Sequence, residues 1–107
     1  MRVLMISAAA LTLLMAAQAA SAKPAQCFTT DDGYYSCDFR GLDSSGSFVV
    51  SAPNRPTYTV EVYQPGRAYG FADFGSGNTS LPGEYIRNRQ DRACWDNTAT
   101  ATQICAW

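Results

Sequence analysis

Hydrophobic and polar residues alternate most clearly in the first half of the stretch 56–75. There Tyr58, Val60 and Val62 are separated by single polar residues, which is the period-two pattern of a half-buried β-strand. Residues 64–67, Gln-Pro-Gly-Arg, have the composition of a tight turn, and a second run of β-forming residues follows it. The pattern therefore predicts an antiparallel hairpin around which we expect the rest of the chain to be organised.

The register of this hairpin determines which side chains face the core. The expected cross-strand pairs are Gln64 with Arg67, Val62 with Tyr69, and Val60 with Phe71. In this register one face of the hairpin is large and apolar, and the other is mixed and small. We therefore expect Tyr58, Tyr69 and Phe71 in the core, and Tyr63 exposed on the small face.

Turn-forming residues recur about every eight to twelve residues, which is the spacing of short strands in an all-β domain. The predicted segments are a hairpin at 27–40 with its loop at 31–33, a strand at 47–51, a break at 52–56, a loop at 76–80, a short strand starting at Tyr85 and a last strand at 100–107. We find no helical pattern after residue 22. These features predict an all-β fold, a small antiparallel β-sandwich or barrel of about 6–8 short strands cross-linked by disulfides.

The N-terminal segment has the composition of a helical export signal. Arg2 precedes an apolar run at 3–17, and Ala20-Ser21-Ala22 matches an A-x-A cleavage site. The apolar run is short for a membrane span, so we expect no membrane span after cleavage. The sequence therefore predicts a signal peptide at 1–22 and a single small exported domain at 23–107, in the periplasm or secreted. Cleavage three residues earlier and a retained anchor are the alternatives.

Four cysteines lie in the expected exported domain, and the chain has no histidine. An even number of cysteines in a short exported chain indicates two disulfides in an oxidising compartment. With the first hairpin loop at 31–33, Cys27 lies opposite Cys37, so the preferred pairs are Cys27–Cys37 and Cys94–Cys105. The main alternative joins Cys27 to Cys105 and Cys37 to Cys94. No C-x-x-C spacing is present, and we expect no metal site.

Composition also argues against several classes of function. Loss of Arg2 with the signal leaves seven basic and nine acidic residues, a net charge of −2, which argues against nucleic-acid binding. The absence of histidine rules out a histidine-dependent catalytic triad, and no G-x-S-x-G motif is present. In the expected register Glu61 and Asp73 lie on opposite faces, so they do not form a pair suited to glycoside hydrolysis. We therefore expect a protein that is not an enzyme and has no cofactor.

Three arginines and a tryptophan near the third cysteine form the candidate binding patch, together with Tyr63. The guanidinium forks of Arg87, Arg89 and Arg92 suit carboxylate, phosphate or sulfate groups. Trp95 can stack on a ring or on a guanidinium, and an exposed Tyr63 offers an apolar face with a polar edge. The alternative is a solvated loop in which these charges offset nearby acids.

These features predict an exported binding or structural module of the cell envelope or extracellular space. The expected partner is an envelope or extracellular protein or a glycan. The motif Tyr35-Ser36-Cys37 and the small β-body are similar to those of periplasmic lysozyme inhibitors. This resemblance implies an alternative function, a small secreted inhibitor of a hydrolase such as lysozyme.

Overall fold

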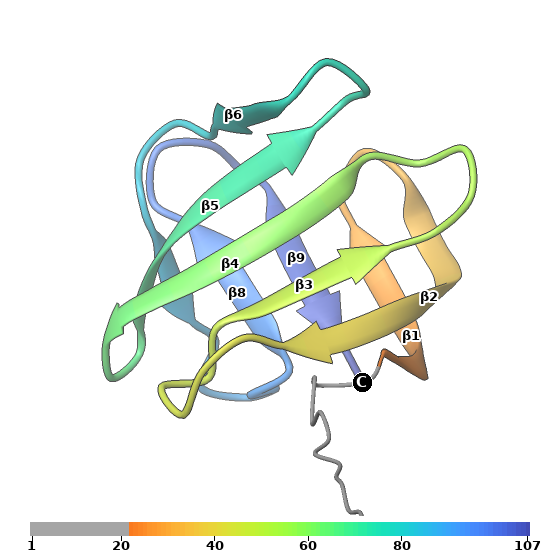
Figure 1. The fold of residues 1–107 in the computed structure, drawn as a ribbon. Coiled ribbons are helices and arrows are strands. Elements are labelled where there is room, and N and C mark those ends of the chain that lie inside the picture. Colours follow the sequence, from red (N-terminus) through yellow and green to blue (C-terminus); the bar gives the residue numbers. More distant parts are fainter. Residues whose placement is uncertain (1–21) are drawn as a thin grey trace, which may run out of the picture.

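The computed structural model describes residues 22–107, which form a closed antiparallel β-barrel (Figure 1). The strands are β1 (Lys23–Thr29), β2 (Gly33–Gly41), β3 (Phe48–Ser51), β4 (Thr57–Gln64), β5 (Arg67–Asp73), β6 (Asn78–Ser80), β7 (Tyr85–Arg87), β8 (Cys94–Asn97) and β9 (Gln103–Ala106). Eight of them pair in the order β1-β2-β3-β4-β5-β7-β8-β9, and β9 pairs with β1 to close the ring. The ninth, β6, pairs with β5 alone. The predicted all-β fold is confirmed, and of its two expected forms the chain adopts the barrel.

The predicted signal peptide, except for Ala22, lies outside the described residues and stays a prediction. In the described part of the chain, no helix is long and apolar enough to cross a membrane.

A β-bulge in the β4–β5 hairpin changes the register predicted from the sequence. Gln64 pairs with Arg67 as expected, but the register shifts by one residue between Val62 and Gln64. Val62 therefore lies opposite Ala68, where the sequence predicted Tyr69. A shift of one residue turns each following side chain of the strand to the other face of the sheet.

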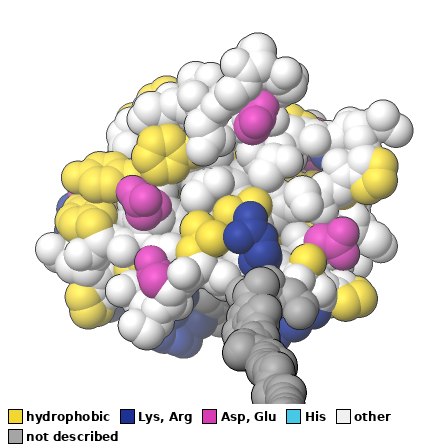
Figure 2. Space-filling model, viewed as in Figure 1, with side chains coloured by type: hydrophobic (Ala, Val, Ile, Leu, Met, Phe, Trp, Pro, Cys, Tyr) yellow, Lys and Arg dark blue, Asp and Glu magenta, His cyan; other side chains and the backbone are white. Residues whose placement is uncertain are grey.

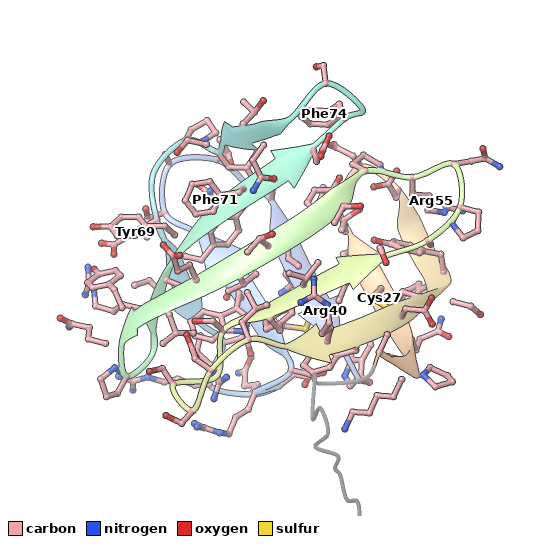
Figure 3. All side chains as sticks on the ribbon, viewed as in Figure 1. Cys27, Arg40, Arg55, Tyr69, Phe71 and Phe74 are labelled. Carbon is pink, nitrogen blue, oxygen red and sulfur yellow. A yellow bond between two sulfur atoms is a disulfide. The ribbon has the colours of Figure 1, made fainter. Side chains whose placement is uncertain are left out.

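The shift reverses the predicted faces of β5. Tyr69 is 45% exposed and Phe71 is partly exposed, so their predicted placement in the core is wrong. Both side chains lie on the outer side of β5 (Figure 3). On β4, Tyr58 precedes the bulge and is buried, and Tyr63, the extra residue at the bulge, is 44% exposed, so both predictions are confirmed.

Small residues fill the inner face of β5, and at its centre the neighbouring ring of Tyr85 occupies the space of a side chain. Ala68 and Ala72 are fully buried, and Gly70 lies between them. A Cβ atom added at Gly70 would overlap the ring of Tyr85 in β7. This contact fixes the inward set of residues, and so it also fixes Tyr69 and Phe71 as the outward set.

Gly70→Ala is expected to lower the free energy of unfolding by about 1–3 kcal/mol, the usual effect of overpacking a core. Gly41→Ala is the matched control, since Gly41 is also in a strand but a Cβ atom there meets open space. Urea unfolding of the two variants measures the difference. Equal stability of both would contradict the contact between Gly70 and Tyr85.

The barrel core contains side chains from every strand of the ring. Trp95 of β8 is 1% exposed and is the largest of the fully buried side chains. The buried cluster comprises Cys27, Tyr35, Cys37, Phe48, Val50, Tyr58, Val60, Ala68, Ala72, Tyr85, Trp95 and Ile104. Burial of aromatic rings on this scale accounts for much of the stability of a small barrel.

Both disulfides join neighbouring strands, and the preferred pairing is confirmed. Cys27–Cys37 links β1 to β2, and Cys94–Cys105 links β8 to β9. Cys94 lies directly opposite Cys105, whereas Cys27 lies opposite Tyr35 and is only diagonal to Cys37. The expected direct opposition of the first pair is therefore wrong, because the loop of this hairpin begins and ends one residue earlier than predicted. The two disulfides indicate an oxidising compartment.

The positions of β6 and of the last strand also differ from prediction. Residues 76–80 were expected to form a loop, but Asn78–Ser80 form β6 and pair with residues 71–73. All three side chains of β6 are exposed, so the segment has no hydrophobic alternation that would mark it as a strand. The last strand covers Gln103–Ala106, a shorter segment than the predicted 100–107.

Candidate functional site

One end of the barrel contains a hollow of about 460 Å³ between the β4–β5 turn, the β2–β3 loop and the end of β7. We call this hollow the basic mouth. It is lined by Ser44, Ser45, Val62, Tyr63, Gln64, Pro65, Gly66, Arg87, Arg92 and Trp95. The fold therefore brings together four of the five predicted patch residues. Ligand sites commonly occur at the mouths of β-barrels.

Arg87 lies at the centre of the basic mouth because of its position in β7. Its cross-strand partner is Trp95 in β8, and its guanidinium carbon lies 4.6 Å from the centroid of the Trp95 ring. The expected role of Trp95 as a surface for a ligand does not fit its burial, since only 1% of the residue is exposed. Trp95 instead holds the Arg87 guanidinium in place by a cation–π contact.

The charge of Arg87 has no acidic ion-pair partner in the part of the chain that the structure describes. Among residues 22–107, the ion pairs are Arg55–Asp32 and Arg67–Glu84. The Nε atom of Arg87 is buried and forms no hydrogen bond within the described residues. Burial, with a smaller contribution from the charge of Arg92, lowers the pKa of the Arg87 guanidinium. An anion placed in the basic mouth would stabilise the charged form of Arg87 and offset its repulsion by Arg92.

A second groove, of about 520 Å³, lies beside the basic mouth and shares the turn residues 64–66 with it. Its lining includes Arg67, Arg87, Arg89 and Arg92. Arg89, the fifth predicted patch residue, therefore joins the others through this groove. Arg87 and Arg92 line both hollows, so the two form one continuous basic surface.

Arg67 belongs to this surface but was not predicted, because in the sequence it only marked the end of a turn. It forms an ion pair with Glu84, and its Nε donates a hydrogen bond to the Tyr63 hydroxyl at 3.1 Å. The Tyr63 hydroxyl donates in turn to the Glu84 carboxylate. The hydrogen bond from Arg67 lowers the pKa of Glu84, so this carboxylate is ionised at neutral pH and offsets the charge of Arg67. The unpaired positive charge of the surface therefore comes from Arg87, Arg89 and Arg92.

The opposite mouth of the barrel has a different character. A hollow of about 170 Å³ there is lined by side chains that include Tyr58, Phe74 and Leu81. Near it, the carboxylate of Asp32 accepts hydrogen bonds from the hydroxyls of Thr29 and Tyr58, at 2.7 and 3.0 Å. The bond from Tyr58 links the first hairpin to β4 and the bond from Thr29 lies within that hairpin, which indicates a structural role for Asp32.

In the described residues, no group of three or more acidic or cysteine side chains is placed to hold a metal ion, and all four cysteines are in disulfides. Comparisons with protein-family models, with curated proteins and with solved structures found no match to this chain. The fold and the site define a small, disulfide-bonded antiparallel β-barrel with a basic surface at one mouth.

Proposed function

We propose that this domain is an exported binding module of the cell envelope or extracellular space, without catalytic activity. The basic mouth binds an anionic group, a carboxylate, phosphate or sulfate, carried by a protein or a glycan. The observation that supports this proposal is Arg87, a partly buried guanidinium that Trp95 holds in the lining of a hollow, with no acidic ion-pair partner among residues 22–107.

The physical argument concerns the free energy of binding an anion. A guanidinium that is already oriented loses little conformational entropy when it forms a two-pronged hydrogen bond. Arg92 adds a second positive charge to the same hollow. Because the expected mature chain has a net charge of −2, this concentration of positive charge is a local feature of one mouth.

Arg87→Gln combined with Arg92→Gln is expected to weaken sulfate or phosphate binding roughly tenfold to a hundredfold, the effect of losing charge-assisted hydrogen bonds. Titration of the labelled domain with sodium sulfate, followed by amide chemical shifts of the β4–β5 turn and residues 87–92, measures the affinity. Arg40→Gln is the matched control, since Arg40 is exposed on β2 and lines neither hollow (Figure 3). Equal affinity in both variants, or no shift at the basic mouth of the unmodified domain, would contradict the proposal.

Inhibition of a hydrolase such as lysozyme stays a second prediction. Adding the domain to lysozyme and to insoluble peptidoglycan separates the two functions. Lower lysozyme activity without pelleting of the domain supports an inhibitor. Pelleting without a change in activity supports a binding module.

A further inference from the structure

The outer face of the β4–β5 hairpin carries a row of three aromatic side chains, two exposed and one partly exposed, that are not part of the core. We call Tyr63, Tyr69 and Phe71 the aromatic row. The rings of Tyr63 and Tyr69 stack with centroids 4.6 Å apart, and Tyr69 and Phe71 project from the same side of β5 (Figure 3). Figure 2 shows hydrophobic side chains gathered over this side of the barrel, with an acidic side chain beside them.

The exposure of the row follows from the fold. The ring of Tyr85 leaves no room for a side chain at the inward position 70, and the bulge turns Tyr69 and Phe71 outward. Clustered aromatic side chains on a surface are unfavourable in water and commonly mark a binding site. Two of the three are tyrosines, whose hydroxyls supply a polar edge to an apolar face.

The row continues into the basic mouth through Tyr63. Its ring stacks on Tyr69, and the same residue lines the hollow that contains Arg87 and Arg92. Its hydroxyl is held by Glu84 and Arg67, which fixes the ring at the junction of the two surfaces. A ligand that covers the row therefore reaches the basic mouth without leaving the protein surface.

We infer that the aromatic row and the basic mouth together bind a polysaccharide that carries acidic groups, with its sugar rings on the row and a carboxylate or other anionic substituent at Arg87 and Arg92. Sugar rings have an apolar face that stacks on aromatic rings and a rim of hydroxyls that forms hydrogen bonds. This inference rests on the proposed function of the basic mouth and names the class of its ligand.

Charges along the row favour this ligand over a lipid bilayer. Glu61 is exposed and lies directly opposite Tyr69, so its carboxylate stands beside the rings. Insertion of the row into a bilayer would bury this charge at a large cost in free energy. A sugar hydroxyl can instead donate a hydrogen bond to it. The acidic groups of the ligand then belong at the basic mouth, away from Glu61.

Affinity electrophoresis in two polymers with the same glucan backbone tests the inference. Carboxymethylcellulose carries carboxylates, and hydroxyethylcellulose is neutral. The unmodified domain is expected to be retarded by both polymers, and several times more strongly by carboxymethylcellulose. Tyr69→Thr combined with Phe71→Thr is expected to lose retardation in both gels. Tyr34→Thr, which removes an exposed aromatic residue of β2 outside the row, is the matched control and should retain it.

The variants distinguish failure of this inference from failure of the proposed function. Arg87→Gln with Arg92→Gln should reduce retardation by carboxymethylcellulose to the level seen with the neutral polymer. If neither polymer retards a domain that still binds sulfate at the basic mouth, the inference is overturned while the proposed function stands. Retardation that the Tyr69 and Phe71 substitutions leave unchanged also overturns it. Thermal unfolding of each variant shows that a loss of binding is not a loss of folding.

Discussion

Reduction of both disulfides is expected to unfold the domain at room temperature. Each disulfide closes a short loop, with sequence separations of 10 and 11 residues. A disulfide that closes a loop of this size contributes about 2–3 kcal/mol to the free energy of unfolding. The free energy of unfolding of a domain is roughly 5–15 kcal/mol, and small domains lie toward the low end of this range. Loss of both disulfides therefore removes most of the stability. Circular dichroism and tryptophan fluorescence with and without dithiothreitol measure the change.

Variants that lack one disulfide separate the two contributions. Cys27→Ser with Cys37→Ser, and Cys94→Ser with Cys105→Ser, are each expected to lower the urea midpoint while leaving a folded domain. The second pair should also weaken sulfate binding, because Cys94 directly precedes Trp95, the residue that supports Arg87. A fully reduced domain that keeps its native near-ultraviolet spectrum would show that the core alone is sufficient for folding.

The disulfide pairing and the β-class were predictable from the sequence because they depend on local features. Turn residues between β-forming segments bring Cys27 close to Cys37 even when the predicted hairpin register is wrong by one residue. The faces of β5 were not predictable in this way. A single bulged residue before Gln64 reverses them, and the inward position of Gly70 then lies against the ring of Tyr85, which is distant in sequence.

The sequence predicted the position of the candidate site better than it predicted the role of each residue in it. Arg87, Arg92, Trp95 and Tyr63 do line one hollow. The sequence could not show that Trp95 is buried, since neither of its neighbours, Cys94 and Asp96, gives a clear alternation. The contribution of Arg67 depends on its contact with Glu84, and the aromatic row depends on the register of the β4–β5 hairpin, so both became visible only in the folded barrel.

Replacement of Trp95 by alanine is expected to lower the free energy of unfolding by about 3–5 kcal/mol, the usual cost of removing a buried tryptophan ring. The loss combines buried apolar area with the cavity that remains in the barrel. Trp107→Ala is the matched control, since this residue is 47% exposed, and it should have a much smaller effect. Urea unfolding measures both. Equal destabilisation by the two substitutions would contradict the placement of Trp95 in the core.

Trp95→Phe extends the same test to binding, because it keeps an aromatic ring in the core with a weaker attraction for a cation. This variant should fold and should bind sulfate less tightly than the unmodified domain, since Arg87 is then held less firmly. Arg40→Gln again serves as the control for an unrelated change in charge. If Trp95→Phe folds and binds sulfate as tightly as the unmodified domain, the cation–π contact between Arg87 and Trp95 is not needed for anion binding. Trp95 then contributes only to the core, and binding depends on the charges of Arg87 and Arg92.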